Sequence, residues 1–298
     1  MTPDQLRIFV AVAERGHVTR AAEILGMSQS AASAAIKALE HGSGVQLFNR
    51  VGRAIELSPA GRRFLPEAKA VLERIATARH VLENASQTIA GSIAIAASQT
   101  IASYWLPHRL AAFQEQHPAV RLDVSIGNTR QVENKVLDGT ADLGLVEGRT
   151  ESDLLRRVRV DVDRLMLVVA RTHPGVAELS PGLPDMASLR WIVRESGSGT
   201  REVLQDLARR MGVAFDSLRI FLVLPSNEAI VQAVEAGAGA TIISELAVGR
   251  AVAEGSLRHV PLDLPERDFA VITHRDRQPT LSQTALKSFL LNNKGFAR

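Results

Sequence analysis

The sequence predicts an α/β protein in three parts: a small helical module that ends in a β-wing, one long helix, and a larger two-lobed domain. Three observations predict this architecture. Apolar residues recur at helical spacing in three short runs near the N-terminus, one helical pattern then continues for about 27 residues, and the remainder alternates strands with helices. We therefore divide the chain into residues 1–58, 59–90 and 91–298.

Composition limits the classes of protein to consider. Of the 298 residues, 46% are hydrophobic and 22% are charged, which is the balance of a globular protein with more than one core. The chain has no cysteine, which excludes disulfides and thiolate metal sites. The first residues lack the basic and apolar runs of a secretion signal, and no apolar stretch reaches the roughly 18 residues that span a bilayer. We expect a cytoplasmic protein that has no membrane partner.

The N-terminal module is predicted to hold three short helices between residues 4 and 39. Thr19 and Ser28 stand where they could cap the second and third helices. Along the third helix, the apolar positions Ala32, Ala35, Ile36 and Leu39 fall on one face. The opposite face carries the polar side chains Gln29, Ser30, Ser33 and Lys37.

A β-wing is predicted after these helices. Residues 46–48 and 55–57 have the pattern of two short strands, and Arg50 and Arg53 lie near the tip of the turn between them. Residues 1–90 hold 11 Lys/Arg and 8 Asp/Glu, a net charge of +3, whereas residues 91–298 hold 24 of each. The excess positive charge of the chain therefore lies in the part that would meet a phosphate backbone.

These features favour a DNA-binding winged helix-turn-helix. In that motif one helix enters the major groove and touches base edges, while a wing and flanking cations hold phosphates. Gln and Ser side chains hydrogen-bond to base edges, and exposed amides at a helix start favour phosphate. The alternative is an alanine-rich helical bundle with an ordinary solvated face. The candidate DNA-binding residues are Thr19, Arg20, Gln29, Ser30, Ser33, Lys37, Arg50 and Arg53.

One long helix is predicted from Pro59 to about Ser86, and at this length it extends about 40 Å. Its apolar residues alternate spacings of three and four, with Arg79 in the remaining seam position, which is typical of a short and imperfect coiled coil. We interpret it as a dimerisation helix. The alternative is an amphipathic helix that packs on its own chain. The seam residues are Leu65, Ala68, Leu72, Ile75 and Leu82.

Beyond Gly91, strands alternate with helices, which predicts parallel sheets covered by helices. A crossing run at Leu165–Ala170 separates two similar sets and indicates two lobes around a cleft. Lobe one is expected to comprise about 91–161 and 268–298, and lobe two about 162–267. The predicted strands are 92–97, 121–126, 143–146, 191–193, 220–224, 240–243 and the returning 269–274; the predicted helices are 101–116, 131–138, 200–211, 228–236 and 282–292.

Small and hydroxyl-bearing residues follow three of these strands, where ligands collect in open α/β sheets. The glycine-rich junction at 196–201 would let backbone amides approach an anion at a helix start. It lacks the Gly-Lys-(Ser/Thr) element of a P-loop and is no Gly-x-Ser-x-Gly elbow. The alternative is that these residues only form turns and caps. The candidate ligand-binding residues are Ser98, Gln99, Thr100, Asn128, Thr129, Glu147, Glu195, Ser196, Ser198, Gly199, Thr200 and Arg201.

The string "LRIFVAVAERGHVTRAAEILGMSQSAASAAIKALE", followed by "LFNRVGRAIELSPAG", resembles the LysR-type transcriptional regulators, and the resemblance covers essentially the whole chain. It implies a winged helix-turn-helix, a linker helix, a periplasmic-binding-protein-like effector domain, and assembly into a homotetramer on double-stranded DNA. "ESGSGTREVL" is similar to the branch concerned with sulfur assimilation and carbon fixation. The effector expected from this similarity is a small oxyanion, with sulfite or sulfate as the first candidates. We expect no metal and no other cofactor.

The chain departs from the family pattern at two places. Ala34 and Ala35 stand where the family often has Arg and Gln, which affects the assignment of base contacts. Ser43 stands where a leucine usually precedes Gly44, which suggests a looser and more exposed approach to the wing.

Two other classes of function remain alternatives. An enzyme would need an anchor for its chemistry, but the eight histidines form no His-x-x-x-His pair. A solute-binding protein would account for residues 91–298 and leaves the N-terminal module unexplained. We therefore expect a regulator and no enzymatic activity.

Overall fold

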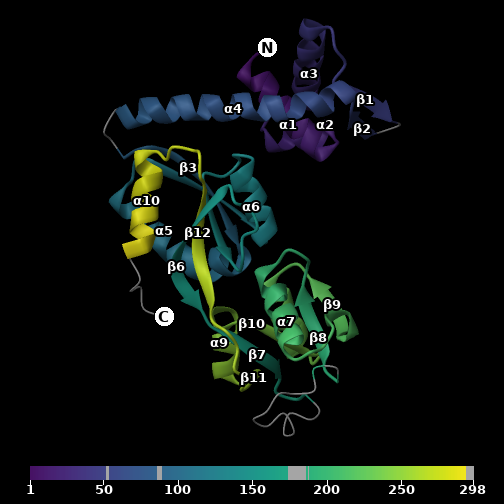
Figure 1. The fold of residues 1–298 in the computed structure, drawn as a ribbon, viewed down its shortest axis with the longest axis vertical. Helices are drawn as coiled ribbons and strands as arrows, with labels where there is room; N and C mark the ends of the chain where they lie inside the picture. The colour runs from purple at the N-terminus through teal and green to yellow at the C-terminus, as the bar shows by residue number, and fades with distance from the viewer. Residues whose placement is uncertain (52–53, 86–88, 174–185, 187, 293–298) are drawn as a thin grey trace. The chain divides into compact units, whose positions relative to one another are not determined.

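The protein forms two compact units, Met1–Ala85 and Ser86–Arg298, in a computed structural model (Figure 1). The structure describes residues 1–51, 54–85, 89–173, 186 and 188–292. No helix in these ranges is long and apolar enough to cross a membrane.

Three helices open the first unit, as predicted: α1 (Pro3–Arg15), α2 (Val18–Ile24) and α3 (Gln29–Ser43). Thr2 and Gln5 form a reciprocal capping box at the start of α1. Ser28 caps α3 as predicted, because its hydroxyl accepts a hydrogen bond from the Ala31 amide at 3.2 Å. The predicted cap at Thr19 is wrong. The N-cap of α2 is His17, so Thr19 lies inside the first turn of that helix.

The core of this unit forms where the apolar faces of the three helices meet. Phe9 of α1 is fully buried, and its ring centroid lies 5.3 Å from that of Phe48 and 5.1 Å from that of Phe64. Ala32, Ile36 and Leu39 of α3 are buried in the same cluster, as their spacing predicted. The opposite face of α3 is therefore left for solvent or a partner.

The wing is an antiparallel pair, β1 (Phe48–Val51) and β2 (Ala54–Leu57), with Phe48 opposite Leu57. The first strand, β1, begins two residues later than predicted, and the cause is a pair of hydrogen bonds to α3. The amides of Leu47 and Phe48 donate to Oε1 of Glu40 at 2.8 and 3.1 Å, so the α3 side chain holds the chain before the strand ladder begins.

The long helix α4 (Pro59–Ala85) has the predicted extent. Ala68 is fully buried in the core of the first unit, and Leu65 and Leu72 pack against that core. The first half of the predicted seam thus packs on its own chain, as expected if α4 were an amphipathic helix of this unit. The side chains of Arg79 and Leu82 lie outside the described residues, and dimerisation through α4 stays a prediction.

Lobe one of the second unit is a five-stranded sheet in the order β4-β3-β5-β12-β6. β3 is parallel to β4 and β5, whereas β12 is antiparallel to β5 and β6. Its strands are β3 (Gly91–Ser98), β4 (Val120–Gly127), β5 (Leu143–Glu147), β6 (Leu155–Asp163) and β12 (Arg267–His274); its helices are the π-helical turn η1 (Ile101–Trp105), α5 (Leu106–Gln116), α6 (Thr129–Leu137) and α10 (Leu281–Asn292).

Lobe two is a second five-stranded sheet, in the order β11-β7-β10-β8-β9, with Trp191 at the centre of its core. β8 is parallel to β9 and β10. Its strands are β7 (Leu165–Ala170), β8 (Arg190–Arg194), β9 (Arg219–Leu224), β10 (Ala240–Ser244) and β11 (Leu257–Val260); its helices are α7 (Gly199–Arg210), the short η2 (Phe215–Ser217), α8 (Asn227–Glu235) and α9 (Glu245–Glu254).

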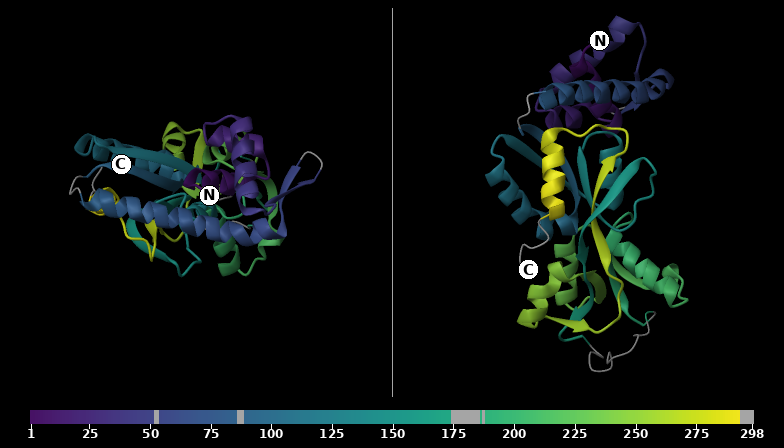
Figure 2. Two further views of the ribbon diagram at one scale, coloured as in Figure 1. Left: turned by 90° about the horizontal axis from the view of Figure 1, so that it is seen from above. Right: turned by 60° about the vertical axis from the view of Figure 1, so that its left-hand side comes forward.

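The two lobes are connected by β6 and β12, which pair along their full lengths; β12, drawn in yellow, is seen running between the lobes (Figure 2). The predicted crossing run at Leu165–Ala170 is wrong, because that segment is β7 and lies inside the sheet of lobe two. The crossing strand is β6, which the sequence analysis did not predict; α9 and β11 were also missed.

Candidate functional site

The polar face of α3 is open, as a DNA-reading helix requires. Gln29, Ser30 and Lys37 are exposed, and Ser33 is half-buried. Thr19 and Arg20 are exposed on α2. The side chain of Arg50 and the whole of Arg53 lie outside the described residues. The structure thus leaves the candidates on the two helices accessible.

The two departures from the family pattern have visible consequences on this unit. Ala34 is exposed on α3, so that position offers a methyl group and no hydrogen-bond donor. Ser43 is exposed as expected, but the backbone here is not loose. Gly44 ends α3 in the left-handed region, with φ of 68°, and its amide donates back to Glu40 and His41.

In the second unit, the carboxyl ends of β3, β4 and β5 meet at one edge of lobe one. Ser98, at the end of β3, is buried and donates a hydrogen bond to the carboxylate of Glu147, at the end of β5. Thr129, which follows β4, donates its hydroxyl proton to the Glu147 carbonyl at 2.8 Å. The sequence-predicted residues of lobe one therefore form one connected group.

The glycine-rich junction of lobe two forms the N-terminus of α7. Ser198 caps this helix, and its hydroxyl accepts a hydrogen bond from the Thr200 amide at 3.3 Å. Gly199 lies so close to lobe one that an added Cβ would stand 2.3 Å from the Glu147 carbonyl oxygen. Only glycine allows this approach, which brings the start of α7 against the end of β5.

Direct hydrogen bonds join the lobes along this junction. The Asn128 side-chain amide donates to the Glu195 carboxylate at 3.1 Å, and the Arg130 amide donates to the Gly197 carbonyl at 3.3 Å. Gln99 accepts from the Asn227 amide at 2.8 Å. The three predicted loops are thus brought together, and the start of α8 joins them.

Arg194, at the end of β8, is a buried residue of this junction that the sequence analysis missed. Its Nε and Nη2 donate to the Glu195 carboxylate at 2.8 and 3.0 Å, and its Nη1 donates to Oδ1 of Asn227 at 2.9 Å. Burial by itself would raise the pKa of Glu195, but the hydrogen bonds from Arg194 and Asn128 lower it below the usual range. Glu195 is thus held ionised.

A second missed group lies where the two crossing strands meet lobe two. Arg267, the first residue of β12, lies opposite Asp163, the last residue of β6, and its Nε donates to the Asp163 carboxylate at 2.6 Å. Nη1 of Arg267 donates to the Thr200 hydroxyl at 3.2 Å and lies 3.9 Å from Oε1 of Glu147. This guanidinium therefore contacts both lobes. Its role could not be seen in any local motif.

Two family profiles cover most of the chain. Residues 3–62 match the bacterial regulatory helix-turn-helix protein of the lysR family, and residues 86–294 match the LysR substrate binding domain. The chain belongs to the LysR family. This LysR-type chain therefore carries both a DNA-binding domain and an effector-binding domain.

Relatives of this LysR-type regulator are named as transcriptional regulators. The uncharacterised HTH-type regulator YeiE of Escherichia coli K12 is 34% identical over 97% of this chain and 96% of its own length. The regulator CysL of Bacillus subtilis is 33% identical over 81% of this chain and 80% of its own. The structure of full-length CbnR complexed with its target DNA shares the fold, with a TM-score of 0.65 and 23% identity over 97% of this chain and 99% of that chain. The enzyme and solute-binding alternatives are therefore set aside.

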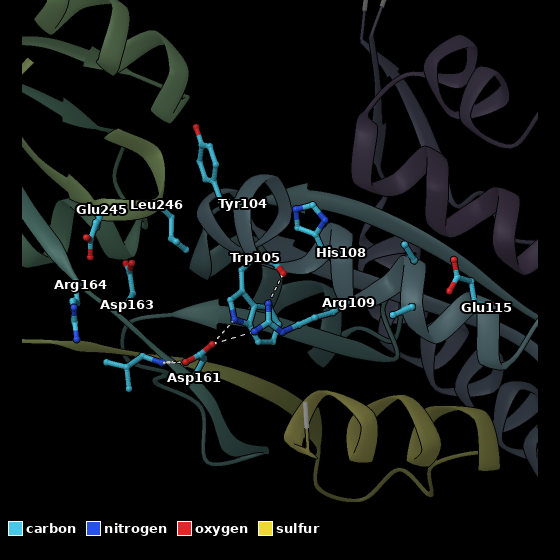
Figure 3. Close-up of a pocket in the computed structure, with 13 residues that line it drawn as sticks. Tyr104, Trp105, His108, Arg109, Glu115, Asp161, Asp163, Arg164, Glu245 and Leu246 are labelled. Carbon is cyan, nitrogen blue, oxygen red and sulfur yellow. Dashed lines mark hydrogen bonds and ion pairs between the residues drawn. The ribbon is translucent and has the colours of Figure 1, made fainter. Parts of the chain in front are cut away.

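A separate pocket of about 520 Å³ opens between lobe one and α9, and none of the sequence-predicted effector residues lines it (Figure 3). Three of its polar side chains contact one another. The Trp105 indole N–H donates to Asp161 at 2.7 Å, Arg109 donates to the same carboxylate oxygen at 3.3 Å, and its guanidinium lies 3.9 Å from the Trp105 ring centroid. These contacts hold the π-helical turn η1, which follows directly after Thr100, against the crossing strand β6.

Carboxylates from both lobes gather beside the interlobe junction. Burial raises the pKa of Glu133 on α6, and the charges of Glu151 and Glu202 raise it further. Burial likewise raises the pKa of Glu202 on α7, with added repulsion from Asp206 and Glu151. The arrangement therefore carries an electrostatic cost at neutral pH that protonation relieves.

Glu202→Gln is expected to raise the thermal unfolding temperature at pH 7 by about 2 °C. A carboxyl whose pKa is raised by folding stabilises the folded state below its unfolded pKa, and this contribution is lost as the pH rises through the folded pKa. The neutral amide of glutamine does not ionise, so the variant keeps this stability at pH 7. The difference in unfolding temperature between the variant and the original protein should therefore shrink as the pH falls toward about 4.5. Thermal unfolding between pH 4.5 and 8 measures it. Glu115→Gln, on an exposed position of α5, is the control, and equal behaviour of the two variants would contradict the prediction.

Proposed function

We propose that this LysR-type regulator senses a small oxyanion, sulfite or a sulfate-like ion, at the junction between its two lobes, and that binding alters its contact with promoter DNA. The observation that carries the proposal is the convergence of the β3, β4 and α7 junctions on one point, where short hydroxyl side chains surround a helix N-terminus. Helix starts and small polar side chains are the ordinary means of binding oxyanions.

The size of the expected effector follows from how close the lobes come. Ser98, Thr100, Ser198 and Thr200 are all buried, and Gly199 leaves no room for even one added carbon atom. A large ligand would have to separate the lobes, whereas a compact anion needs only small shifts of these short side chains. We therefore place the effector among ions of a few heavy atoms.

The carboxylate of Glu147 favours sulfite over sulfate within this class. It is buried and accepts a hydrogen bond from Ser98, so an approaching dianion would meet a negative charge. Sulfite is partly protonated near neutral pH and could donate its proton to this carboxylate. Sulfate is fully deprotonated and has no proton to donate.

The DNA-binding and oligomeric parts of the proposal come from the first unit and the long helix. Gln29, Ser30 and Ser33 are proposed to face base edges, and Arg20 and Lys37 to face phosphates. We propose that α4 pairs two copies and that a homotetramer forms in the cytoplasm, with no metal or other cofactor. Effector binding would act by population shift, since it favours one closure state of the lobes.

Calorimetric titration of the full-length protein tests the effector. Sulfite, sulfate, phosphate and acetate are compared at one ionic strength, and we expect the tightest binding for sulfite. Absence of binding heat with all four ions would remove the oxyanion proposal. Tighter binding of sulfate than of sulfite would remove the role given to Glu147.

The two functions should separate in a pair of single-residue variants. Ser33→Ala is expected to weaken binding to the promoter about tenfold, through loss of a base contact, and to leave sulfite affinity unchanged. Thr200→Ala is expected to do the reverse, because its hydroxyl lies in the interlobe junction and meets Arg267 at 3.2 Å. Gel-shift titration and calorimetry on both variants measure this. If each variant reduced both affinities equally, the proposed division between the two units would be wrong.

A further inference from the structure

We infer that Arg267 is the cationic anchor of the effector, and that its Nη2 is the donor held free for an oxygen of the anion. The inference rests on the proposed function and adds a residue outside the three effector loops. Arg267 lies at the start of β12, 66 residues beyond the last loop residue, Arg201.

The Arg267 guanidinium is buried and one of its donors is unpaired in the part of the chain that the structure describes. Arg267 is only 8% exposed, and its Nη2 has no hydrogen-bond partner among the described residues. A buried donor on a charged group that has no hydrogen-bond partner destabilises the folded protein. Such a donor is retained when a ligand satisfies it, and at a junction between two closing lobes that ligand is the effector.

The contacts of the Arg267 guanidinium also support its role as the anchor. Nη1 of the same guanidinium already touches the Thr200 hydroxyl at the start of α7, and it lies 3.9 Å from the Glu147 carboxylate at the end of β5. Nη2 is bonded to the same carbon atom as Nη1 and is likewise buried. Asp163 holds Nε at 2.6 Å and so fixes the direction of the planar group.

The guanidinium groups of the two neighbouring arginines already contact other residues. All three nitrogens of Arg194 donate to Glu195 or Asn227, so its charge is balanced within lobe two. Arg201 donates from Nη1 to the Arg194 carbonyl at 3.0 Å, and its guanidinium lies over the Phe215 ring at 4.9 Å. Arg267 is therefore the buried cation of this junction, within the described residues, that keeps a donor for an incoming anion.

This assignment specifies the chemistry of the ligand. A planar guanidinium with one arm held by Asp163 and one by Thr200 offers a directed N–H to a negatively charged oxygen. An anionic oxygen forms a charge-assisted hydrogen bond with the free donor, whereas an uncharged molecule of the same size forms a weaker one. The ligand class is therefore an oxyanion and not a neutral polyol or amide.

Arg267→Lys is the sharpest variant, because lysine keeps the charge beside Asp163 and removes the second arm. Sulfite is titrated into the full-length variant by calorimetry, with Arg164→Lys as the matched control, since Arg164 is exposed near the same end of β6. We expect at least tenfold weaker sulfite binding for Arg267→Lys and unchanged binding for the control. Thermal unfolding and effector-free promoter binding of Arg164→Lys should match those of the original protein, and thermal unfolding of Arg267→Lys shows whether that variant is folded.

Because an altered buried ion pair can prevent folding, a second variant, Asp163→Asn with Arg267→Gln, removes both charges together and should fold. It should lose sulfite binding. Wild-type sulfite affinity in Arg267→Lys or in the double variant would overturn the inference and leave the proposed function standing. If the original protein binds no oxyanion, the proposed function itself is wrong, and the inference falls with it.

Discussion

Gly199→Ala is expected to weaken effector binding about 100-fold while promoter binding without effector persists. The new methyl group would stand 2.3 Å from the Glu147 carbonyl oxygen and 3.1 Å from its carbon, and both atoms belong to the backbone of the opposite lobe. Backbone atoms cannot move aside as a side chain does, so the start of α7 must retreat from β5. Overpacking at such a contact costs about 1–3 kcal/mol, which at its upper end is a factor of about 150 in affinity.

The measurement is calorimetry with sulfite together with gel-shift titration on the full-length variant. Gly249→Ala is the matched control, because it places the same methyl group in α9 of the same lobe, where no atom lies within 4 Å. That change should leave sulfite binding intact and stabilise the helix by up to about 1 kcal/mol. Sulfite binding at full strength in Gly199→Ala would show that closure of the lobes at this point is not needed.

The helices and strands that sequence could predict are those whose apolar runs or capping residues are visible within one short stretch of chain. β3 and β5 are continuous apolar runs in the middle of a sheet, and α7 follows a serine cap, so local chemistry defines each of them. β6 is different. It alternates Arg, Val and Asp along Leu155–Asp163 because only one side of this crossing strand packs in a core, and its charged positions are typical of a loop.

The same distinction divides the candidate site. The loops after β3, β4 and β8 were predicted because glycine and hydroxyl residues at strand ends have a local meaning. Arg267 and Asp163 were not predicted, because their pairing depends on the register of two strands 104 residues apart. Arg194 was missed for a related reason, since its hydrogen bond to Asn227 depends on how α8 packs beside the end of β8.

Gly61→Ala is expected to weaken promoter binding at least 100-fold and to leave sulfite binding unchanged. An alanine Cβ at this position of α4 would stand 2.1 Å from the Leu47 carbonyl oxygen and 2.9 Å from the Leu57 side chain. Leu47 is also held by Glu40 of α3 at 2.8 Å, and its carbonyl accepts from the Ser58 amide at 2.9 Å. The clash therefore lies where α4, the start of the wing and α3 contact one another.

Relief of that clash must shift either α4 or the start of the wing, and each shift would misplace groups that we propose to contact DNA together. We expect the first unit to lose about 3 kcal/mol of stability and promoter affinity to fall at least 100-fold. Gel-shift titration and thermal unfolding measure the two effects. Gly42→Ala in α3 is the control, because no atom lies within 4 Å of its added methyl group. Since the proposed effector site lies wholly in the second unit, a parallel loss of sulfite binding in Gly61→Ala would mean that the two units do not fold independently.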